Sequence, residues 1–74
     1  MEIVMTKDYD AELTRWTIST RLPGRYGVLA AGGTIYGDTK GRFEDGDSIF
    51  TSPIQEFDIV NMIIITKNTR YKLV

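Results

Sequence analysis

The chain has 74 residues, nine basic and ten acidic, a formal net charge of −1, and neither cysteine nor histidine. A chain of this length is expected to form one small domain, residues 1–74, whose core is marginal unless another chain adds to it. Without cysteine and histidine there are no disulfides and no usual zinc site, and the near-neutral charge disfavours a general nucleic-acid binder, which carries a clear basic excess.

Short runs of β-branched and aromatic residues, separated by turn signals, dominate the chain. The Pro23-Gly24 dipeptide is a typical turn, and Pro53 suggests an edge strand or a bend. The predicted strands are, in chain order, residues 2–5, 13–20, 26–31, 48–54, 58–66 and 70–74. The last two are expected to form a hairpin. Residues 34–36 are either a further short strand or an extension of residues 26–31 past a glycine bulge.

Residues 13–20 alternate with a period of two, which is typical of a half-buried strand. The alternation places Trp16 and Ile18 on the side expected to face the core, and Leu13 on the opposite side. A helix over residues 10–19 is the competing interpretation, and the threonines of the segment disfavour it.

Turn signals that recur every 8–12 residues or so are typical of a small sandwich or barrel. We therefore predict an all-β fold of five or six short antiparallel strands in a barrel-like sheet, SH3-like or OB-like, because closing the sheet removes its exposed edges. One short helix near residues 10–19 is the alternative within this fold.

An acidic stretch, Glu44 to Asp47, surrounds Gly46. Asp45 and Asp47 have the separation of two calcium ligands, but Gly46 falls between them and the flanks are strand-like, whereas the EF-hand loop has its glycine after a third ligand and is flanked by helices. The favoured interpretation is a tight hairpin, in which Asp45-Gly46 supplies the positive φ angles of a primed turn. No metal and no cofactor are predicted.

No catalytic pattern stands out, and we predict a protein that is not an enzyme. Thr51 and Ser52 lack a histidine base, and one of the two is expected to bond to a neighbouring strand or to the turn backbone. The glycine-rich residues 30–41 match neither of the common phosphate-binding motifs, so a bulge or loop is predicted there.

Four arginines stand directly before an aromatic residue, at Arg15, Arg25, Arg42 and Arg70. Such pairs can serve single-stranded nucleic acid, whose bases stack on rings while cations contact phosphate. On a strand, however, sequence neighbours point to opposite faces, so ordinary amphipathic patterning explains them too. Arginine and aromatic residues also dominate protein–protein contacts.

The most apolar run is Ile59 to Ile65, which is far shorter than the roughly 20 residues of a membrane-spanning helix. If it is one strand, both of its faces are apolar and both need to be covered. A central strand buried within the domain is one explanation. A homodimer that associates through Val60, Met62 and Ile64 is the other.

The C-terminal half carries a pattern of spaced residues: Arg42-Phe43-x-Asp45-Gly46-x-x-Ile49-x-Thr51-Ser52-x-Ile54, then Thr66-x-Asn68-x-x-Tyr71-x-Leu73. This pattern resembles one found in short bacteriophage and mobile-element proteins, a population that includes inhibitors of the anti-CRISPR type. The resemblance covers about thirty residues and transfers no catalytic residue.

The resemblance implies a non-enzymatic protein-binding module, concretely a phage-encoded inhibitor of a bacterial defence complex of the CRISPR–Cas kind. Its partner would be a host protein or ribonucleoprotein. The alternative is a small barrel that binds single-stranded nucleic acid. The lack of cysteine and of a leader-like start predicts the cytoplasm, that of the host bacterium if the protein is phage-encoded. The predicted partner-binding residues are Arg25, Tyr26, Tyr36, Arg42, Glu44, Asp45 and Asp47.

Overall fold

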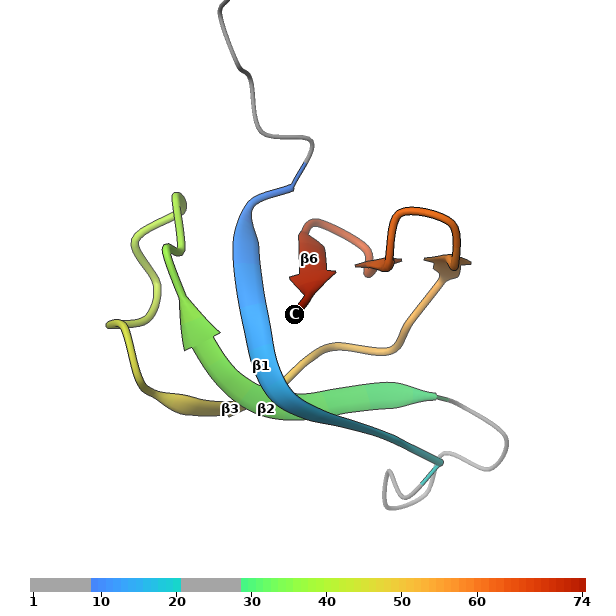
Figure 1. The fold of residues 1–74 in the computed structure, drawn as a ribbon, viewed down its shortest axis with the longest axis horizontal. Helices are drawn as coiled ribbons and strands as arrows, with labels where there is room; N and C mark the ends of the chain where they lie inside the picture. The colour runs from blue at the N-terminus through green and yellow to red at the C-terminus, as the bar shows by residue number, and fades with distance from the viewer. Residues whose placement is uncertain (1–8, 21–28) are drawn as a thin grey trace, which may run out of the picture.

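The computed structural model describes residues 9–20 and 29–74, which form six strands and no helix (Figure 1). The predicted all-β class is therefore confirmed, and the alternative of a helix near residues 10–19 is wrong. The predicted strand at residues 2–5 and the Pro23-Gly24 turn lie outside the described residues. The strands are β1 Ala11–Ser19, β2 Ala30–Tyr36, β3 Ser48–Phe50, β4 Glu56–Asp58, β5 Ile63–Ile65 and β6 Arg70–Leu73.

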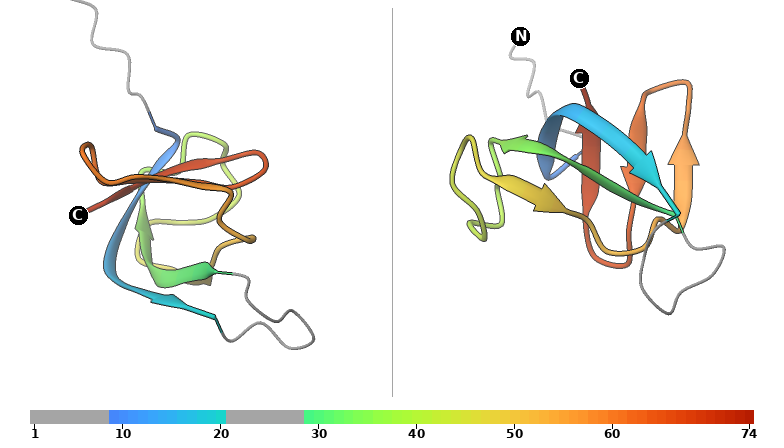
Figure 2. Two further views of the ribbon diagram at one scale, coloured as in Figure 1. Left: turned by 90° about the vertical axis from the view of Figure 1, so that its right-hand side faces the viewer. Right: turned by 90° about the horizontal axis from the view of Figure 1, so that it is seen from below.

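The six strands form one sheet in the order β3-β2-β1-β6-β5-β4. Strands β1 and β6 are parallel, with Leu13 opposite Leu73, and the other neighbours are antiparallel. The predicted barrel does not close, because β3 and β4 are the two edges and do not pair with each other. The sheet is instead strongly curved, with the β1–β3 half and the β4–β6 half turned toward one another (Figure 2).

Strand β1 contains a bulge, where it bends (Figure 1). Thr14 lies opposite Thr34 and Thr17 opposite Gly32, so two residues of β1 face the single residue Gly33. Arg15, within the bulge, has a φ of 49°, a left-handed conformation that is uncommon outside glycine.

The bulge changes which side chains of β1 face the core. Before it Leu13 is fully buried, whereas Trp16, the second residue of the bulge, and Ile18 after it pack against the same core cluster. The predicted alternation is thus right for Trp16 and Ile18 and wrong for Leu13. The extra residue shifts the two-residue period by one, which alternation alone cannot reveal.

Residues 58–66 form two short strands and a turn, and the single strand predicted there is wrong. Strand β4 ends at Asp58, whose carboxylate accepts hydrogen bonds from the backbone and side-chain amides of Asn61, at 3.2 and 2.9 Å. Met62 has a φ of 55°, and β5 begins after it. Both the Asx-type capping and the left-handed residue favour a turn over a continuous strand.

The predicted self-association face is overturned by this turn, because its three residues do not share a strand face. Val60 lies in the turn and is 87% exposed, Met62 packs against the core, and Ile64 is fully buried in it. A surface formed by all three is therefore impossible while the domain is folded.

The other elements follow the sequence more closely. The hairpin of β5 and β6 is confirmed, and Thr66 N–H bonds to Thr69 O at 2.9 Å in its turn. Residues 34–36 extend the strand predicted at residues 26–31, as one of the two alternatives had it, and over the part that the structure describes they form one strand, β2. In the predicted strand 48–54 only β3 is regular, and a bend at Ser52 follows it.

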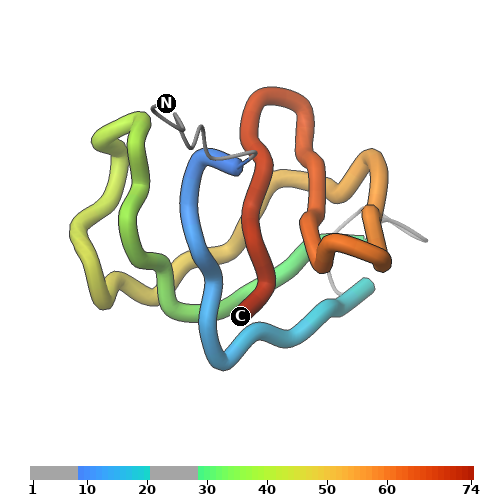
Figure 3. Tube along the Cα trace, turned by 45° about the horizontal axis from the view of Figure 1, so that its top comes forward, coloured from blue at the N-terminus to red at the C-terminus, as the bar shows by residue number. Residues whose placement is uncertain are grey.

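The core lies on the inner side of the curved sheet and draws on both halves. Its cluster consists of Ala11, Leu13, Ala31, Ile35, Ile49, Ile64, Tyr71 and Leu73. Tube and ribbon views show the β4–β6 segment folding back toward β1 and β2 around this centre (Figure 3). No helix among the described residues is long and apolar enough to cross a membrane.

Candidate functional site

The loop between β2 and β3, residues 37–47, carries most of the predicted contact residues and is organised around Asp38. The Asp38 side chain is 1% exposed and accepts hydrogen bonds from three backbone N–H groups. The donors are Lys40, Arg42 and Phe43, at 3.1, 2.9 and 3.1 Å. Burial alone raises the pKa of the Asp38 carboxyl, but these donors and the Arg42 guanidinium together hold that pKa below its usual value.

Arg42 is engaged inside the molecule. Its guanidinium pairs with Asp38 at 3.4 Å and donates to the Thr69 hydroxyl at 3.0 Å. It also lies 5.3 Å from the centre of the Phe43 ring and 6.0 Å from that of Tyr71. Arg42 therefore attaches the loop to the start of β6, and its side chain is 37% exposed.

The acidic turn, Glu44 to Asp47, is also held by its own backbone. Asp45 accepts from Gly37 N–H at 2.7 Å, and Asp47 accepts from Glu44 N–H at 3.0 Å. Gly46 has a φ of 92° while Asp45 has a negative φ, which is the φ pattern of a type II turn and not of a primed turn with two positive values. No group of three or more potential metal ligands occurs among the residues that the structure describes.

The predicted contact residues separate into two groups. Arg25 and Tyr26 lie outside the described residues. Tyr36, Arg42, Glu44, Asp45 and Asp47 lie in or beside the β2–β3 connection and are all exposed. The structure thus brings these five to one end of the β1–β3 half of the sheet.

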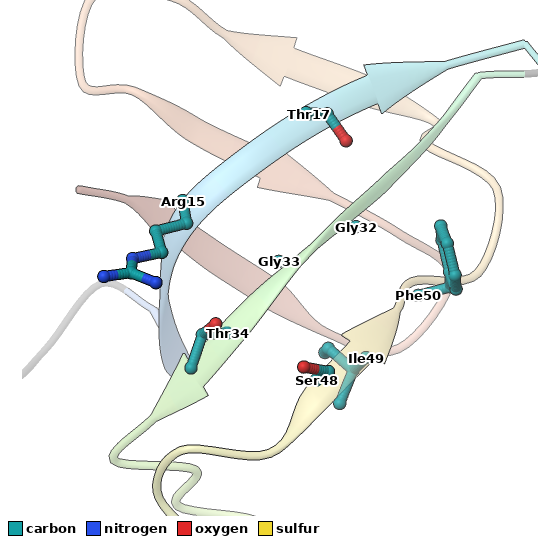
Figure 4. A pocket seen from close by; sticks show the side chains of 8 residues that line it. All are labelled: Arg15, Thr17, Gly32, Gly33, Thr34, Ser48, Ile49 and Phe50. Carbon is teal, nitrogen blue, oxygen red and sulfur yellow. The ribbon is translucent and has the colours of Figure 1, made fainter.

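A depression lies on the outer face of the same half, with a volume of about 280 Å³ (Figure 4). Strands β1, β2 and β3 all contribute to it. The residues that line it are Arg15, Thr17, Gly32, Gly33, Thr34, Ser48, Ile49 and Phe50. We call it the diglycine depression.

Gly32 and Gly33 form the middle of this surface, and neither position has room for a Cβ unless a neighbouring group moves. A Cβ on Gly32 would lie 2.8 Å from the Phe50 ring, and one on Gly33 would lie 2.7 Å from Thr14 O and 2.9 Å from the Leu13 side chain. Gly32 is opposite Phe50 in the register, so the ring lies over the bare backbone of Gly32. Phe50 is 80% exposed, which is unusual for a phenylalanine.

Arg15 borders the depression on the side of β1, with Thr17 and Thr34 between it and Phe50 (Figure 4). Arg42–Asp38 is the ion pair found among residues 9–20 and 29–74, and within these ranges the Arg15 side chain forms no hydrogen bond or ion pair. The depression thus combines a cation that has no partner in this part of the chain, hydroxyl groups and an exposed ring.

On the strands, the prediction that an arginine and the aromatic residue directly after it point to opposite faces is correct. Arg15 and Arg70 are exposed, whereas Trp16 and Tyr71 turn toward the core. In the loop, Arg42 instead lies against the ring of Phe43. Of Thr51 and Ser52, it is Thr51 that is buried, and its hydroxyl accepts from Ala31 N–H at 3.0 Å, as expected for a bond to a neighbouring strand.

Sequence reasoning did not single out Phe50, nor did it place Arg15 at the same depression. The signal, an exposed phenylalanine opposite a glycine, depends on the register between β2 and β3, and that register becomes visible only in the folded sheet. Comparison of the chain with protein-family models, with curated proteins and with solved structures gives no match.

Proposed function

We propose that this chain is a non-enzymatic protein-binding module that acts in the cytoplasm and binds its partner through the diglycine depression. The observation that carries the proposal is Phe50, which is 80% exposed and borders the same depression as Arg15, an arginine without an ion pair among the described residues. Aromatic residues and arginine supply most of the energy in protein interfaces. An uncovered ring of this size costs solvation free energy until a partner covers it.

Residues predicted from the sequence extend this surface. Thr34 and Ser48 lie opposite each other and belong to the outer face together with Gly32 and Phe50. Because side chains alternate along a strand, Tyr36 continues the same face of β2, and the acidic turn lies directly before Ser48. The proposed contact surface thus runs from Arg15 and Phe50 to Tyr36 and the acidic turn.

The first test compares the proteins that the tagged chain captures from a bacterial lysate with those captured by Phe50→Ala and Arg15→Ala, using quantitative mass spectrometry. A hot-spot residue costs about 2 kcal/mol or more when truncated, so a specific partner should be retained roughly 30-fold less by either variant. Val60→Ala is the matched control, because Val60 is also largely exposed but lies in the turn after β4, on the other half of the sheet. Equal retention by all four proteins contradicts the proposal.

The resemblance in the C-terminal half adds a narrower hypothesis, which rests on that resemblance alone: inhibition of a bacterial defence complex of the CRISPR–Cas kind. It is tested by plaque assays in strains that carry one defined defence system each, with and without expression of the chain. Restored plaque formation in one strain, lost again with Phe50→Ala, supports it. Unchanged immunity in every strain rejects it.

Single-stranded nucleic acid is the second candidate ligand, because Arg15 and the Phe50 ring border the same depression and could contact phosphate and base. Fluorescence anisotropy of labelled single-stranded DNA and RNA distinguishes it. Phosphate contacts would give binding that weakens steeply with salt and is lost in Arg15→Ala. Absence of binding at low salt removes this candidate.

A further inference from the structure

Strand β3 is an edge of the sheet, and the register shows which of its backbone groups bond to no other strand among the described residues. Ile35 N–H bonds to Asp47 O at 2.9 Å, and Thr51 N–H bonds to Ala31 O at 2.7 Å. Residues that alternate with these on an antiparallel strand point away from the neighbour. The N–H and C=O groups of Ser48 and Phe50 therefore face outward from the sheet, and those of Ile49 face β2.

This free edge is complementary to itself. If a second copy is placed antiparallel with a two-fold axis at Ile49, Ser48 of each chain lies opposite Phe50 of the other. Both residues of each pair have outward-facing groups, so each pair exchanges two N–H···O=C bonds. We propose that the chain forms a two-fold symmetric dimer through β3, which makes one continuous sheet of two molecules.

The side chains fit this arrangement. Ser48 and Phe50 lie on the outer face, so each exposed Phe50 ring gains a neighbour from the second copy, while Ile49 stays 8% exposed on the core side. The bend at Ser52 and the missing N–H of Pro53 end the pairing after a few residues. An interface this short is below the usual size of a stable one, so the dimer is expected to be weak and dependent on concentration.

Charges at the ends of the edge determine which orientation is favoured. Antiparallel pairing about Ile49 places Gly46 of one copy opposite Ser52 of the other. Ser52 borders a hollow of about 430 Å³ together with Lys67, and within the described residues Lys67 has no ion pair. The Glu44 carboxylate, in the acidic turn, is likewise unpaired in that part of the chain. The pairing thus brings Glu44 of each copy toward Lys67 of the other.

The proposal goes beyond partner binding and does not depend on it. In the dimer the two diglycine depressions lie on the same face of the continuous sheet, on either side of the axis. A partner with two equivalent surfaces could then engage both at once.

Sedimentation equilibrium over a range of concentrations tests the dimer. The unchanged chain should show a monomer–dimer equilibrium, and Ser48→Pro should shift it to the monomer at least tenfold in dissociation constant, because this N–H faces away from β2 and is needed only by the second copy. Circular dichroism shows whether Ser48→Pro folds. If it does not fold, Phe50→Lys is the test variant in its place, because it puts two like charges beside the two-fold axis.

Val60→Lys is the control, since Val60 is exposed at the turn after the opposite edge strand. A chain that remains monomeric at every concentration overturns the proposal. So does a dimer that persists in Ser48→Pro and Phe50→Lys but dissociates in Val60→Lys, which would place the interface at the other edge.

A charge exchange tests the orientation. Glu44→Lys and Lys67→Glu should each weaken the dimer roughly tenfold, because each places like charges together at two symmetric positions. The double variant should return to the affinity of the unchanged chain. If the double variant is weaker than either single one, the antiparallel pairing about Ile49 is wrong.

Discussion

Asp38 shows how much one carboxylate can organise in a small loop. It is nearly fully buried by its own loop, and three backbone N–H groups and Arg42 surround it. A neutral side chain of the same shape would accept fewer and weaker hydrogen bonds. The carboxylates of Asp38, Asp45 and Asp47 thus accept hydrogen bonds from the backbone amides of their own loop.

We expect Asp38→Asn to lower the free energy of unfolding by about 2 kcal/mol at neutral pH, because hydrogen bonds to a charged acceptor are lost. Urea unfolding monitored by circular dichroism measures the change. Glu44→Gln is the control, since the Glu44 carboxylate accepts no hydrogen bond within the described residues, and it should leave the stability unchanged. Equal effects of the two substitutions would contradict the role assigned to Asp38.

The same pair of proteins gives a pH dependence. The pKa of Asp38 is lowered in the folded state, so the unfolded chain takes up the proton first as the pH falls. The stabilisation is complete above the ordinary carboxyl pKa of about 4 and is lost as the pH falls through the lower folded value. The difference in stability between the unchanged chain and Asp38→Asn should therefore shrink on acidification below pH 4 or so, and a constant difference would refute this.

Gly33 is the residue at which substitution should be least tolerated. An added Cβ would lie 2.7 Å from the Thr14 carbonyl oxygen, which cannot move without disturbing β1. We expect Gly33→Ala to cost about 3 kcal/mol or more, enough to unfold a small domain. In Gly32→Ala the Cβ meets the exposed Phe50 ring, which can turn away, so the thermal midpoint should fall much less.

At the scale of the elements, substitutions in the bulge of β1 should change the stability of the fold and the binding of a partner in different ways. Arg15 has a left-handed φ of 49° that a non-glycine residue adopts at a cost of about 1 kcal/mol. We expect Arg15→Gly to raise the free energy of unfolding by up to about 1 kcal/mol while it weakens partner binding. Arg15→Ala keeps the strained backbone, so it should weaken binding without the gain in stability. A loss of stability in Arg15→Gly would show that the bulge is not strained.

The elements also show what a sequence can predict. Strand composition and turn residues were sufficient for the all-β class, for the hairpin of β5 and β6, and for a turn at Asp45-Gly46. They failed at Arg15 and Met62, where a non-glycine residue has a positive φ without any local signal. Apolar residues from Ile59 to Ile65 looked like one strand because hydrophobicity does not reveal a turn that Asp58 and Asn61 stabilise by side-chain bonds.

The candidate site was less predictable than the fold. Residues in the acidic turn and Tyr36 were named because they are polar or aromatic near a turn, and the structure leaves them exposed. Phe50 and Arg15 are 35 residues apart in the numbering and border the same depression only because β2 joins their strands. That arrangement depends on strand order, and a mixed order with a parallel pair does not follow from alternation.

For the whole molecule, the parallel pair of β1 and β6 closes the core. Leu13 and Leu73 lie opposite each other and are nearly or fully buried. We expect Leu73→Ala to cost about 2–5 kcal/mol, because it removes apolar contact and leaves a cavity between the two halves. Thermal unfolding followed by circular dichroism measures it. Val74→Ala, one residue further and 63% exposed, should change little, and similar losses in both would contradict this account.

The bulge in β1 shifts the alternation of inward and outward side chains along the strand by one residue. Without it, a strand that buries Leu13 would turn Trp16 and Ile18 into water, and each such side chain gives up roughly 1.5–3 kcal/mol when it leaves a core. The left-handed conformation of one residue costs about 1 kcal/mol, which is less than the loss from exposing both side chains. A strand with the bulge is therefore more stable than one without it. Deletion of Arg15 should therefore lower the free energy of unfolding far more than any substitution there. Without the extra residue, the side chains that follow it in β1 would exchange their inward and outward directions.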